Sequence, residues 1–338
     1  MASVGIIGAS GYTGAELLRL CAQHPELEVR VATGDTQAGT RAADLYPSLA
    51  AAYPELTFAS YDPAAVDGLD LVFLGLPHGA SQAIVPDIVD KVGHIVDLAA
   101  DFRLQDPGQY PRWYGEAHTS PELLPRFAYG LPELYRDEIL ALGHVATPGC
   151  YPTAASLALA PLVRAGAVER AGIIVDAASG VSGAGRPPKP NTTFCAVDED
   201  FTAYGLLDHR HTPEMEQVLG ATVLFTPHLA PMNRGILATC YARPAAETTT
   251  EALLELMRDA YEDEPFVVVT EGSPSTKATL GSNCAVVTAR YDERTGWVVA
   301  LAAIDNLTKG ASGAAVQCAN LLLDLPETTG LPIAGVYP

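Results

Sequence analysis

Basic side chains are scarce in this sequence. The 338 residues include 40 acidic side chains and only 20 lysines and arginines, so the formal net charge is −20. A field of this sign opposes the binding of nucleic acids and of anionic membrane surfaces. We therefore expect no nucleic-acid partner and no membrane partner. A site for an anionic ligand has to be built from local hydrogen-bond donors and a few basic residues.

The sequence also lacks long apolar runs and paired cysteines. No apolar run approaches the roughly 18–20 residues of a membrane helix, and residues 1–8 show no basic segment followed by a cleavable apolar stretch. The six cysteines include no C-x-x-C pair, which is unlike a disulfide framework or a zinc site. These absences predict a cytoplasmic protein with reduced thiols and no metal. The 48% of hydrophobic residues is enough for a sizeable core.

Apolar runs and helical spacing alternate over the first part of the chain. Strand patterns at 27–32, 69–76 and 94–98 alternate with helical patterns at 14–23 and 80–92. This order predicts a doubly wound parallel sheet of the Rossmann type, in the α/β class, over residues 1–148.

The pattern changes near residue 148. Strand candidates become frequent and few helices separate them, which predicts an α+β domain with a mixed or antiparallel sheet over 149–306. The strand candidates are 172–177, 221–226, 235–242, 266–270, 284–291 and 297–304. Residues 307–338 are expected to begin with a helix that returns to the first domain.

A glycine-rich loop, Gly8-Ala9-Ser10-Gly11-Tyr12-Thr13-Gly14, lies between the first strand and the first helix. Glycine permits positive φ and removes the Cβ that would obstruct a phosphate. The helix N-terminus beyond it offers N–H groups to a pyrophosphate. Because the spacing is G-x-x-G-x-x-G rather than G-x-G-x-x-G, a turn that only packs the helix on the sheet stays open as the alternative.

Asp35 follows the second strand, and Pro77 follows the strand at 69–76. An acid in the position of Asp35 can bind the ribose hydroxyls of NAD, whereas the 2′-phosphate of NADP favours Arg, Ser or Thr. Asp35 is equally explained as a turn residue. The residues therefore leave NAD and NADP both open, and Pro77 can line the dinucleotide from the next strand end.

Cys150 differs from the other cysteines because it lies in a Pro-Gly turn that opens a helix. The positive end of a helix favours a thiolate, so Cys150 is the candidate nucleophile, with a buried structural thiol as the alternative. His209, Arg210 and His211 come just before a second short helix that contains Glu214. A histidine can exchange protons near neutrality and an arginine can pair with an anion. Two histidines without a third ligand pattern do not favour zinc.

Five segments together resemble one family. They are GASGYTGAELLRL from Gly8, ATPGCYPTA from Ala146, ASGVSGAGR from Ala178, YGLLDHRHTPEM from Tyr204 and IDNLTKGASGAAVQ from Ile304. In this order they resemble the N-acetyl-γ-glutamyl-phosphate reductases, relatives of aspartate-semialdehyde dehydrogenase. The resemblance implies an NADP-dependent oxidoreductase of arginine biosynthesis that forms an aldehyde from an acyl phosphate and assembles as a homodimer or homotetramer.

The resemblance also implies residue roles. Cys150 would form a thioester, His209 would be the acid/base, and His211, Arg210 and Glu214 would support them. The expected cofactor-binding residues are Gly8, Ser10, Gly11, Tyr12, Thr13, Gly14, Asp35, Pro77, Ser179, Gly180 and Asn306. The candidates for binding the substrate's anionic groups are Arg103, Arg186, Lys189 and Arg234. Many relatives have Ser or Arg where this chain has Gly34-Asp35, so NAD stays possible.

Two other functions remain open from the sequence. A sister reductase acting on an aminoadipyl or aspartyl phosphate would use the same chemistry, although the aspartate enzymes usually carry an N-C-x-x motif that is absent around Cys150. A dinucleotide-binding sensor without turnover would keep the glycine loop but would need neither Cys150 nor His209.

Overall fold

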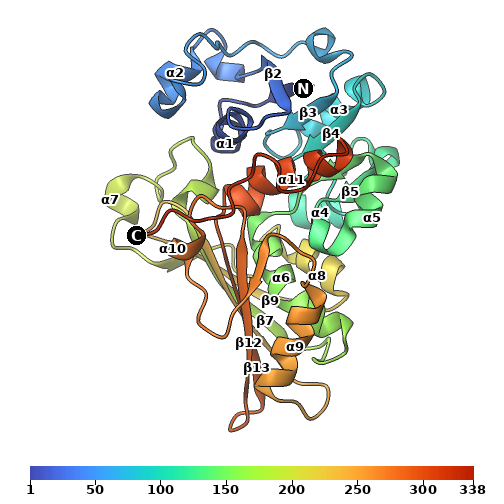
Figure 1. Cartoon of the computed structure of the whole chain (residues 1–338), viewed down its shortest axis with the longest axis vertical. Coiled ribbons are helices and arrows are strands. Elements are labelled where there is room, and N and C mark those ends of the chain that lie inside the picture. Colours follow the sequence, from blue (N-terminus) through green and yellow to red (C-terminus); the bar gives the residue numbers. More distant parts are fainter. The chain divides into compact units, whose positions relative to one another are not determined.

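The computed structural model describes residues 1–338 and divides them into two compact units (Figure 1). The first unit comprises residues 1–148 and 311–331, and the second comprises residues 149–310 and 332–338. The sequence placed the whole of 307–338 with the first unit. Residues 307–310 instead belong to the second unit, and the chain returns to that unit at residue 332, where Asn283 N–H donates to Pro332 O at 2.8 Å.

The first unit is built on a six-stranded sheet in the order β2-β1-β3-β4-β6-β5, in which every pairing is parallel. The strands are β1 (Ala2–Ile7), β2 (Leu27–Ala32), β3 (Leu71–Leu74), β4 (His94–Asp97), β5 (Phe127–Tyr129) and β6 (His144–Ala146). β1 and β3 are completely or almost completely buried at their carboxyl ends. The strand order reverses between β1 and β3, and this is where doubly wound sheets bind ligands. The structure confirms the predicted Rossmann architecture.

Six α-helices accompany this sheet. They are α1 (Tyr12–Cys21), α2 (Ala42–Leu45), α3 (Ser81–Ile88), α4 (Tyr110–Tyr114), α5 (Pro132–Leu142) and α11 (Gly313–Leu322). The helix expected from residue 307 begins instead at Gly313, after a π-helical turn over Thr308–Ser312. α11 packs against α1, α5 and β4. It is fixed there by buried polar pairs, such as His24 Nε2 with Asn320 Oδ1 at 2.9 Å.

The second unit contains a seven-stranded mixed sheet in the order β11-β12-β13-β10-β7-β9-β8. The strands are β7 (Ile173–Gly180), β8 (Thr202–Ala203), β9 (Val223–Ala230), β10 (Ile236–Ala242), β11 (Val267–Val269), β12 (Ala285–Asp292) and β13 (Trp297–Ile304). The pairs β7–β9 and β11–β12 are parallel and the others are antiparallel. The predicted α+β domain with a mixed sheet is therefore confirmed.

One face of this sheet is covered by helices and the other is half-exposed. α6 (Cys150–Arg164) packs on β10, β12 and β13, and its residues 151–163 are all buried. α8 (Thr212–Leu219) packs on β9, and α9 (Thr250–Ala260) packs on β12. The short helices α7 (Phe194–Val197) and α10 (Thr276–Thr279) complete the unit. No helix of the structure combines the length and the apolarity needed to cross a bilayer.

Candidate active site

The glycine loop of the first unit contains two glycines that packing requires and one that it does not. Gly8 has φ +88°, and a Cβ there would lie 2.3 Å from Gly75 O. A Cβ on Gly14 would lie 2.4 Å from the Cα of Ala9. A Cβ on Gly11 would meet nothing closer than Gly8 O at 3.6 Å. Packing therefore explains Gly8 and Gly14, whereas the backbone at Gly11 would accommodate a Cβ.

The N-terminus of α1 is not capped by its own chain. Gly11 is the N-cap in an extended conformation without a side-chain hydrogen bond, and the first turn contains no acidic residue. The first intrahelical bond runs from Ala15 N–H to Gly11 O, so the N–H groups of Tyr12, Thr13 and Gly14 have no partner within the helix. Ser10 is used differently, since its hydroxyl donates to Gly34 O at 3.0 Å. This helix end fits a pyrophosphate.

The strand ends beside the loop place Asp35 and Pro77 on the exposed surface of the first unit. Asp35 adopts φ +46°, the left-handed conformation that Asp tolerates in turns. A Cβ on the preceding Gly34 would lie 2.7 Å from Cβ of Phe58, so that backbone packs tightly. The geometry explains Asp35 as a turn residue and leaves its carboxylate available at the surface.

A buried carboxylate, which sequence reasoning did not identify, organises the loop after β3. Asp101 accepts hydrogen bonds from Gly79 N–H at 2.8 Å, Gln82 N–H at 3.0 Å and the Ser81 hydroxyl at 2.9 Å. Its other neighbour is His78, with 2.5 Å between Nδ1 and Oδ1. Desolvation opposes ionisation here, but these four partners prevail and lower the pKa of Asp101 to about 2. Asp101 thus fixes the loop that begins α3.

In the second unit, Cys150 begins α6 at an end that resembles the start of α1. Its N-cap, Gly149, is extended and makes no side-chain hydrogen bond, and the first turn contains no acid. Cys150 is half-buried, whereas Cys21 and Cys240 are buried core residues in which burial raises the thiol pKa, to about 12 for Cys21. The helix end favours a thiolate at Cys150.

Two side chains of the α8 segment hold the cysteine turn. Glu214 is fully buried, and its Oε2 accepts a hydrogen bond from Gly149 N–H at 2.9 Å. The imidazole of His211 lies against the same residue, because a Cβ on Gly149 would be 2.4 Å from His211 Nε2. Gly149 is therefore needed for the close approach of the imidazole. The structure thus places His211 and Glu214, two of the expected supporting residues, against the residue that precedes Cys150.

His209 lies beside His211 in an aromatic environment. The ring centroids of the two histidines are 4.8 Å apart, and His209 also contacts the rings of Phe225 and Tyr204. His209 Nδ1 accepts the backbone N–H of His211 at 3.1 Å, so the neutral ring carries its proton on Nε2. Burial and then the charge of Arg210 lower the pKa of His209 to about 4. His209 is therefore neutral near pH 7.

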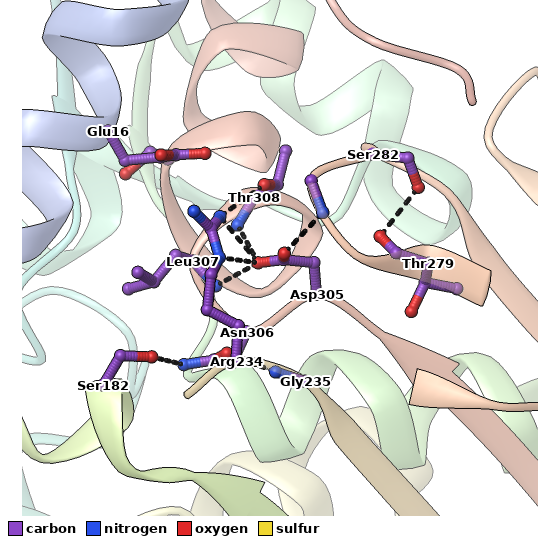
Figure 2. A network of polar contacts seen from close by, with 12 residues as sticks. Glu16, Ser182, Arg234, Gly235, Thr279, Ser282, Asp305, Asn306, Leu307 and Thr308 are labelled. Atoms are coloured by element: carbon purple, nitrogen blue, oxygen red, sulfur yellow. Dashed lines mark hydrogen bonds and ion pairs between the residues drawn. The ribbon is translucent and has the colours of Figure 1, made fainter. Parts of the chain in front are cut away.

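Asn306 joins loops at the carboxyl ends of strands β7 and β9. Its Oδ1 accepts from Gly235 N–H at 2.7 Å and its Nδ2 donates to the Ser182 hydroxyl at 2.9 Å, as Figure 2 shows. Ser179, at the end of β7, is buried and directs its hydroxyl to Gly180 O at 3.0 Å. Sequence reasoning named Ser179 and Gly180 but missed Ser182, which lies in the same G-x-x-G-rich segment.

The four basic residues expected at the substrate do not form one cluster within either unit. Arg103 belongs to the first unit, is buried, and donates from Nη2 to Leu98 O at 2.8 Å. Arg234 donates to Asp305 and to Thr308. Arg186 and Lys189 lie in the segment after β7, and Lys189 is exposed. No group of three or more His, Cys, Asp or Glu side chains is arranged to hold a metal ion.

Comparison with protein families divides the chain in the same way. Residues 3–142 match the semialdehyde dehydrogenase NAD binding domain, and residues 150–306 match the semialdehyde dehydrogenase dimerisation domain. The first unit is thus a nicotinamide-dinucleotide-binding domain, and the second is of a type that forms oligomers.

Solved structures show the same fold. The aspartate semialdehyde dehydrogenase with NADP from Candida albicans has a TM-score of 0.73 at 15% identity and covers 96% of this chain and 99% of that one. The Vibrio cholerae aspartate semialdehyde dehydrogenase II has a TM-score of 0.70 at 16% identity and covers 96% of this chain and 98% of that one.

Relatives in sequence are much nearer. N-acetyl-gamma-glutamyl-phosphate reductase from Symbiobacterium thermophilum is 50% identical over 99% of both chains. The protein of the same name from Desulforudis audaxviator is 48% identical over the full length of both. The chain belongs to the family of N-acetyl-gamma-glutamyl-phosphate reductases, within the semialdehyde dehydrogenases.

Proposed function

We propose that this protein reduces N-acetyl-γ-glutamyl phosphate to N-acetylglutamate 5-semialdehyde and phosphate with NADPH, in arginine biosynthesis. The observation that carries the proposal is the half-buried Cys150 at the uncapped start of α6, with His211 and Glu214 holding its turn. The relatives that bear this enzyme's name are 45–50% identical over the whole chain.

The reaction divides one displacement into two steps at Cys150. The thiolate sulfur bonds to the acyl carbon, the bond from carbon to the phosphate oxygen breaks, and phosphate leaves with that electron pair. When bound, the nicotinamide cofactor supplies the hydride that reduces the resulting thioester. Hydride addition leaves a negatively charged oxygen on that carbon; this oxygen re-forms the C=O bond as the C–S bond breaks, so the aldehyde leaves and the thiolate is restored.

We propose that His211 takes the thiol proton and that His209 orients it. The sequence favoured His209 for proton transfer. His209, however, already accepts the His211 N–H on Nδ1 and its pKa is lowered to about 4, so it is a weak base near neutrality. The His211 imidazole lies against Gly149, the residue preceding the sulfur. His209 therefore acts by holding the backbone of residue 211 rather than by taking the proton itself.

The first turn of α6 is the natural place for the oxyanion of the tetrahedral intermediate. Gly149 N–H is taken by Glu214, whereas the next N–H groups at the start of the helix have no partner within it. Donors aimed at developing charge in a site that excludes water are often the largest catalytic contribution. Glu214 therefore acts by fixing the turn rather than by contacting substrate.

For the cofactor, we propose that the turn at Gly11 and the uncapped start of α1 receive the pyrophosphate. NADP is the proposed dinucleotide, and Asp35 is the residue that sets how strongly NADP is preferred over NAD. Comparing kcat/KM for NADPH and NADH tests this choice. A strong preference for NADH would overturn the NADP assignment, and Asp35→Ser should then shift the preference toward NADPH.

A panel of acyl phosphates tests the reaction itself. N-acetyl-γ-glutamyl phosphate is compared with aspartyl and aminoadipyl phosphates, and phosphate-dependent oxidation of the matching aldehydes is measured in the reverse direction. We expect the acetylglutamyl compound to have the highest kcat/KM. A higher value for another chain would reassign the substrate, and no turnover with any of them would favour a dinucleotide-binding sensor.

We also propose a homodimer or homotetramer. The second unit matches a dimerisation domain, and one face of its sheet is half-exposed, with Leu224 50% and Val268 48% exposed. Light scattering on the purified protein measures the mass directly. A monomer at micromolar concentration would contradict the proposal.

A further inference from the structure

We infer that Asp305 is a positioning residue: its buried carboxylate fixes the 306–310 segment beside Cys150, and Arg234 is its counterion rather than a ligand of the substrate. The kinetic test of this inference rests on the proposed function. The claim that Asp305 fixes the 306–310 segment concerns only the second unit, and the reactivity of the Cys150 thiol tests it separately.

Asp305 lies just after β13 and is completely buried. Its Oδ1 accepts from Arg234 Nε at 3.1 Å and Nη2 at 2.9 Å, and from the backbone N–H of Leu307 at 2.8 Å and Thr308 at 3.0 Å. Its Oδ2 accepts from Gly281 N–H at 2.7 Å. Figure 2 shows these bonds converging on one side chain from three different segments. Both oxygens of the carboxylate are therefore engaged.

Each partner comes from a separate part of the sequence. Arg234 lies in the turn between β9 and β10, Gly281 lies before β12, and the N–H groups belong to the segment after β13. A buried carboxylate is tolerated only when it is paired and hydrogen-bonded. The hydrogen bonds of Asp305 therefore fix the relative positions of these three loops. The guanidinium of Arg234 is directed at Asp305 and at the Thr308 hydroxyl, which lies 2.9 Å from Nη2.

The same segment reaches Cys150 through Gly310. The Gly310 N–H donates to the backbone O of Asp305 at 2.9 Å, which closes the turn. A Cβ on Gly310 would lie 2.9 Å from the Cβ of Cys150. Gly310 thus forms one wall beside the cysteine, and its position is set by the turn that Asp305 holds. A displacement of about 1 Å at a reacting group can cost about 100-fold in rate.

Asn306 extends the arrangement to the loop after β7. Through its bonds to Gly235 N–H and to the Ser182 hydroxyl it connects the Arg234 turn with that loop. From the other side, the loop before β12 is held by the C-terminal segment, where Val336 N–H donates to Leu280 O at 2.7 Å. Gly281 is therefore a fixed support for the Asp305 carboxylate.

Two near-isosteric variants test the inference. Asp305→Asn replaces one acceptor oxygen with an NH₂ group that must face either Gly281 N–H or the Arg234 and Thr308 donors. Thr308→Val removes only the hydroxyl that receives Arg234 Nη2 and is the milder change if the first variant folds poorly. Arg258→Met is the matched control, because Arg258 pairs with Glu251 and Glu271 at the exposed surface of the same unit.

For each variant we measure kcat, KM, the melting temperature and the alkylation rate of Cys150 by iodoacetamide, resolved by peptide mass spectrometry. We expect Asp305→Asn to lower kcat about 10- to 100-fold with KM changed less than about threefold, since the reacting group is displaced while the substrate still binds. The Cys150 alkylation rate should change in the same variant. Thr308→Val should follow in the same direction with a smaller effect, and Arg258→Met should match the wild type.

A lower melting temperature with unchanged kcat and unchanged Cys150 alkylation would show that Asp305 is only structural and would overturn the inference. A third variant, Arg234→Lys, is measured in the same way. If it raises KM and leaves kcat and the Cys150 alkylation rate unchanged, Arg234 binds the substrate and the inference is wrong on this point. If wild-type protein reduces none of the acyl phosphates, the proposed function fails, while the alkylation comparison still decides the role of Asp305.

Discussion

The turn at Gly11 and the turn at Gly149 are alike in backbone and opposite in surroundings. Each glycine is the extended N-cap of a helix that has no side-chain cap and no acid in its first turn. A Cβ on Gly11 would make only an ordinary contact, 3.6 Å from Gly8 O, whereas a Cβ on Gly149 would lie 2.4 Å from the His211 ring. The first turn is open for a ligand, and the second is filled by a side chain of the protein.

The proposed function gives the two helix ends different roles. At α1 we expect the helix end to receive an anionic group of a ligand. At α6 we expect the helix end to act instead on the sulfur of Cys150, in a turn whose Gly149 contacts Glu214 and His211. The following variants test this difference, beginning with the largest expected effect.

Cys150→Ala should abolish turnover, because no other group can form the acyl intermediate. The affinity for NADPH should remain within a few-fold, since the glycine turn belongs to the other unit. Steady-state rates and fluorescence titration of NADPH measure the two quantities. Turnover near the wild-type level would show that Cys150 is not the nucleophile.

His211→Asn should slow kcat by about 10²–10⁴-fold, the usual loss for a removed acid/base. His209→Asn should have a smaller effect, because an asparagine oxygen can still accept the backbone N–H of residue 211. The two variants are compared under identical saturating conditions. If His209→Asn shows the larger loss, His209 is the acid/base that the sequence pointed to.

Gly149→Ala should reduce kcat by about 100-fold, because the new methyl group has to displace the imidazole or the cysteine turn. The Cys150 alkylation rate of this variant should also change. Gly166→Ala is a control in the same unit, at a surface position where a Cβ meets nothing within 4 Å. Its positive φ of +66° makes it a test of strain alone. Equal losses in both variants would contradict the specific role of Gly149.

Gly11→Ala and Gly14→Ala should separate binding from stability in the first unit. Gly11→Ala has room in the structure, so it should leave the melting temperature unchanged and raise the KM for NADPH several-fold by narrowing the space at the helix end. Gly14→Ala forces a Cβ against Ala9 Cα and should destabilise the unit by about 1–3 kcal/mol. Unchanged KM in Gly11→Ala would indicate that the turn only packs.

The smallest expected effect is a dependence of stability on pH. The folded-state pKa of His209 is lowered to about 4, below the ordinary histidine value of 6.5, so the unfolded chain binds more protons between these values. Stability should therefore be complete above about pH 6.5 and decline as the pH falls toward 4. Thermal melts at pH 7 and pH 5 should show a smaller decline for His209→Asn than for the wild type. An equal decline would contradict the low pKa.

Much of this fold could be predicted because its signals are local. The buried strand β3 appears as a continuous apolar run, and α6 shows its start through the Pro-Gly turn before Cys150. The three-residue strands β5 and β6 could not be found in this way, because they are too short to show a period. The tail at 332–338 joins the second unit through backbone bonds, which leave no pattern in side-chain chemistry.

The sequence indicates the candidate reactive residues of the site more readily than the residues that hold its loops in place. Cys150, His209 and His211 have distinctive chemistry, so the sequence alone makes them candidates. Asp101 and Asp305 organise loops through hydrogen bonds from backbone N–H groups distant in sequence, and an isolated aspartate gives no sign of such partners. The partner of Arg234 was hidden for the same reason. The charge of Arg234 suggested a substrate ligand, but the carboxylate that it contacts belongs to Asp305, 71 residues away in the sequence.

The central claim is that the sulfur of Cys150 carries the acyl group. The most direct measurement mixes the wild-type protein with N-acetyl-γ-glutamyl phosphate without NADPH and locates the adduct by peptide mass spectrometry. One N-acetylglutamyl group should appear on Cys150, and adding NADPH should discharge it as the semialdehyde. Absence of the adduct, or equal labelling of the exposed Cys195, would contradict the account.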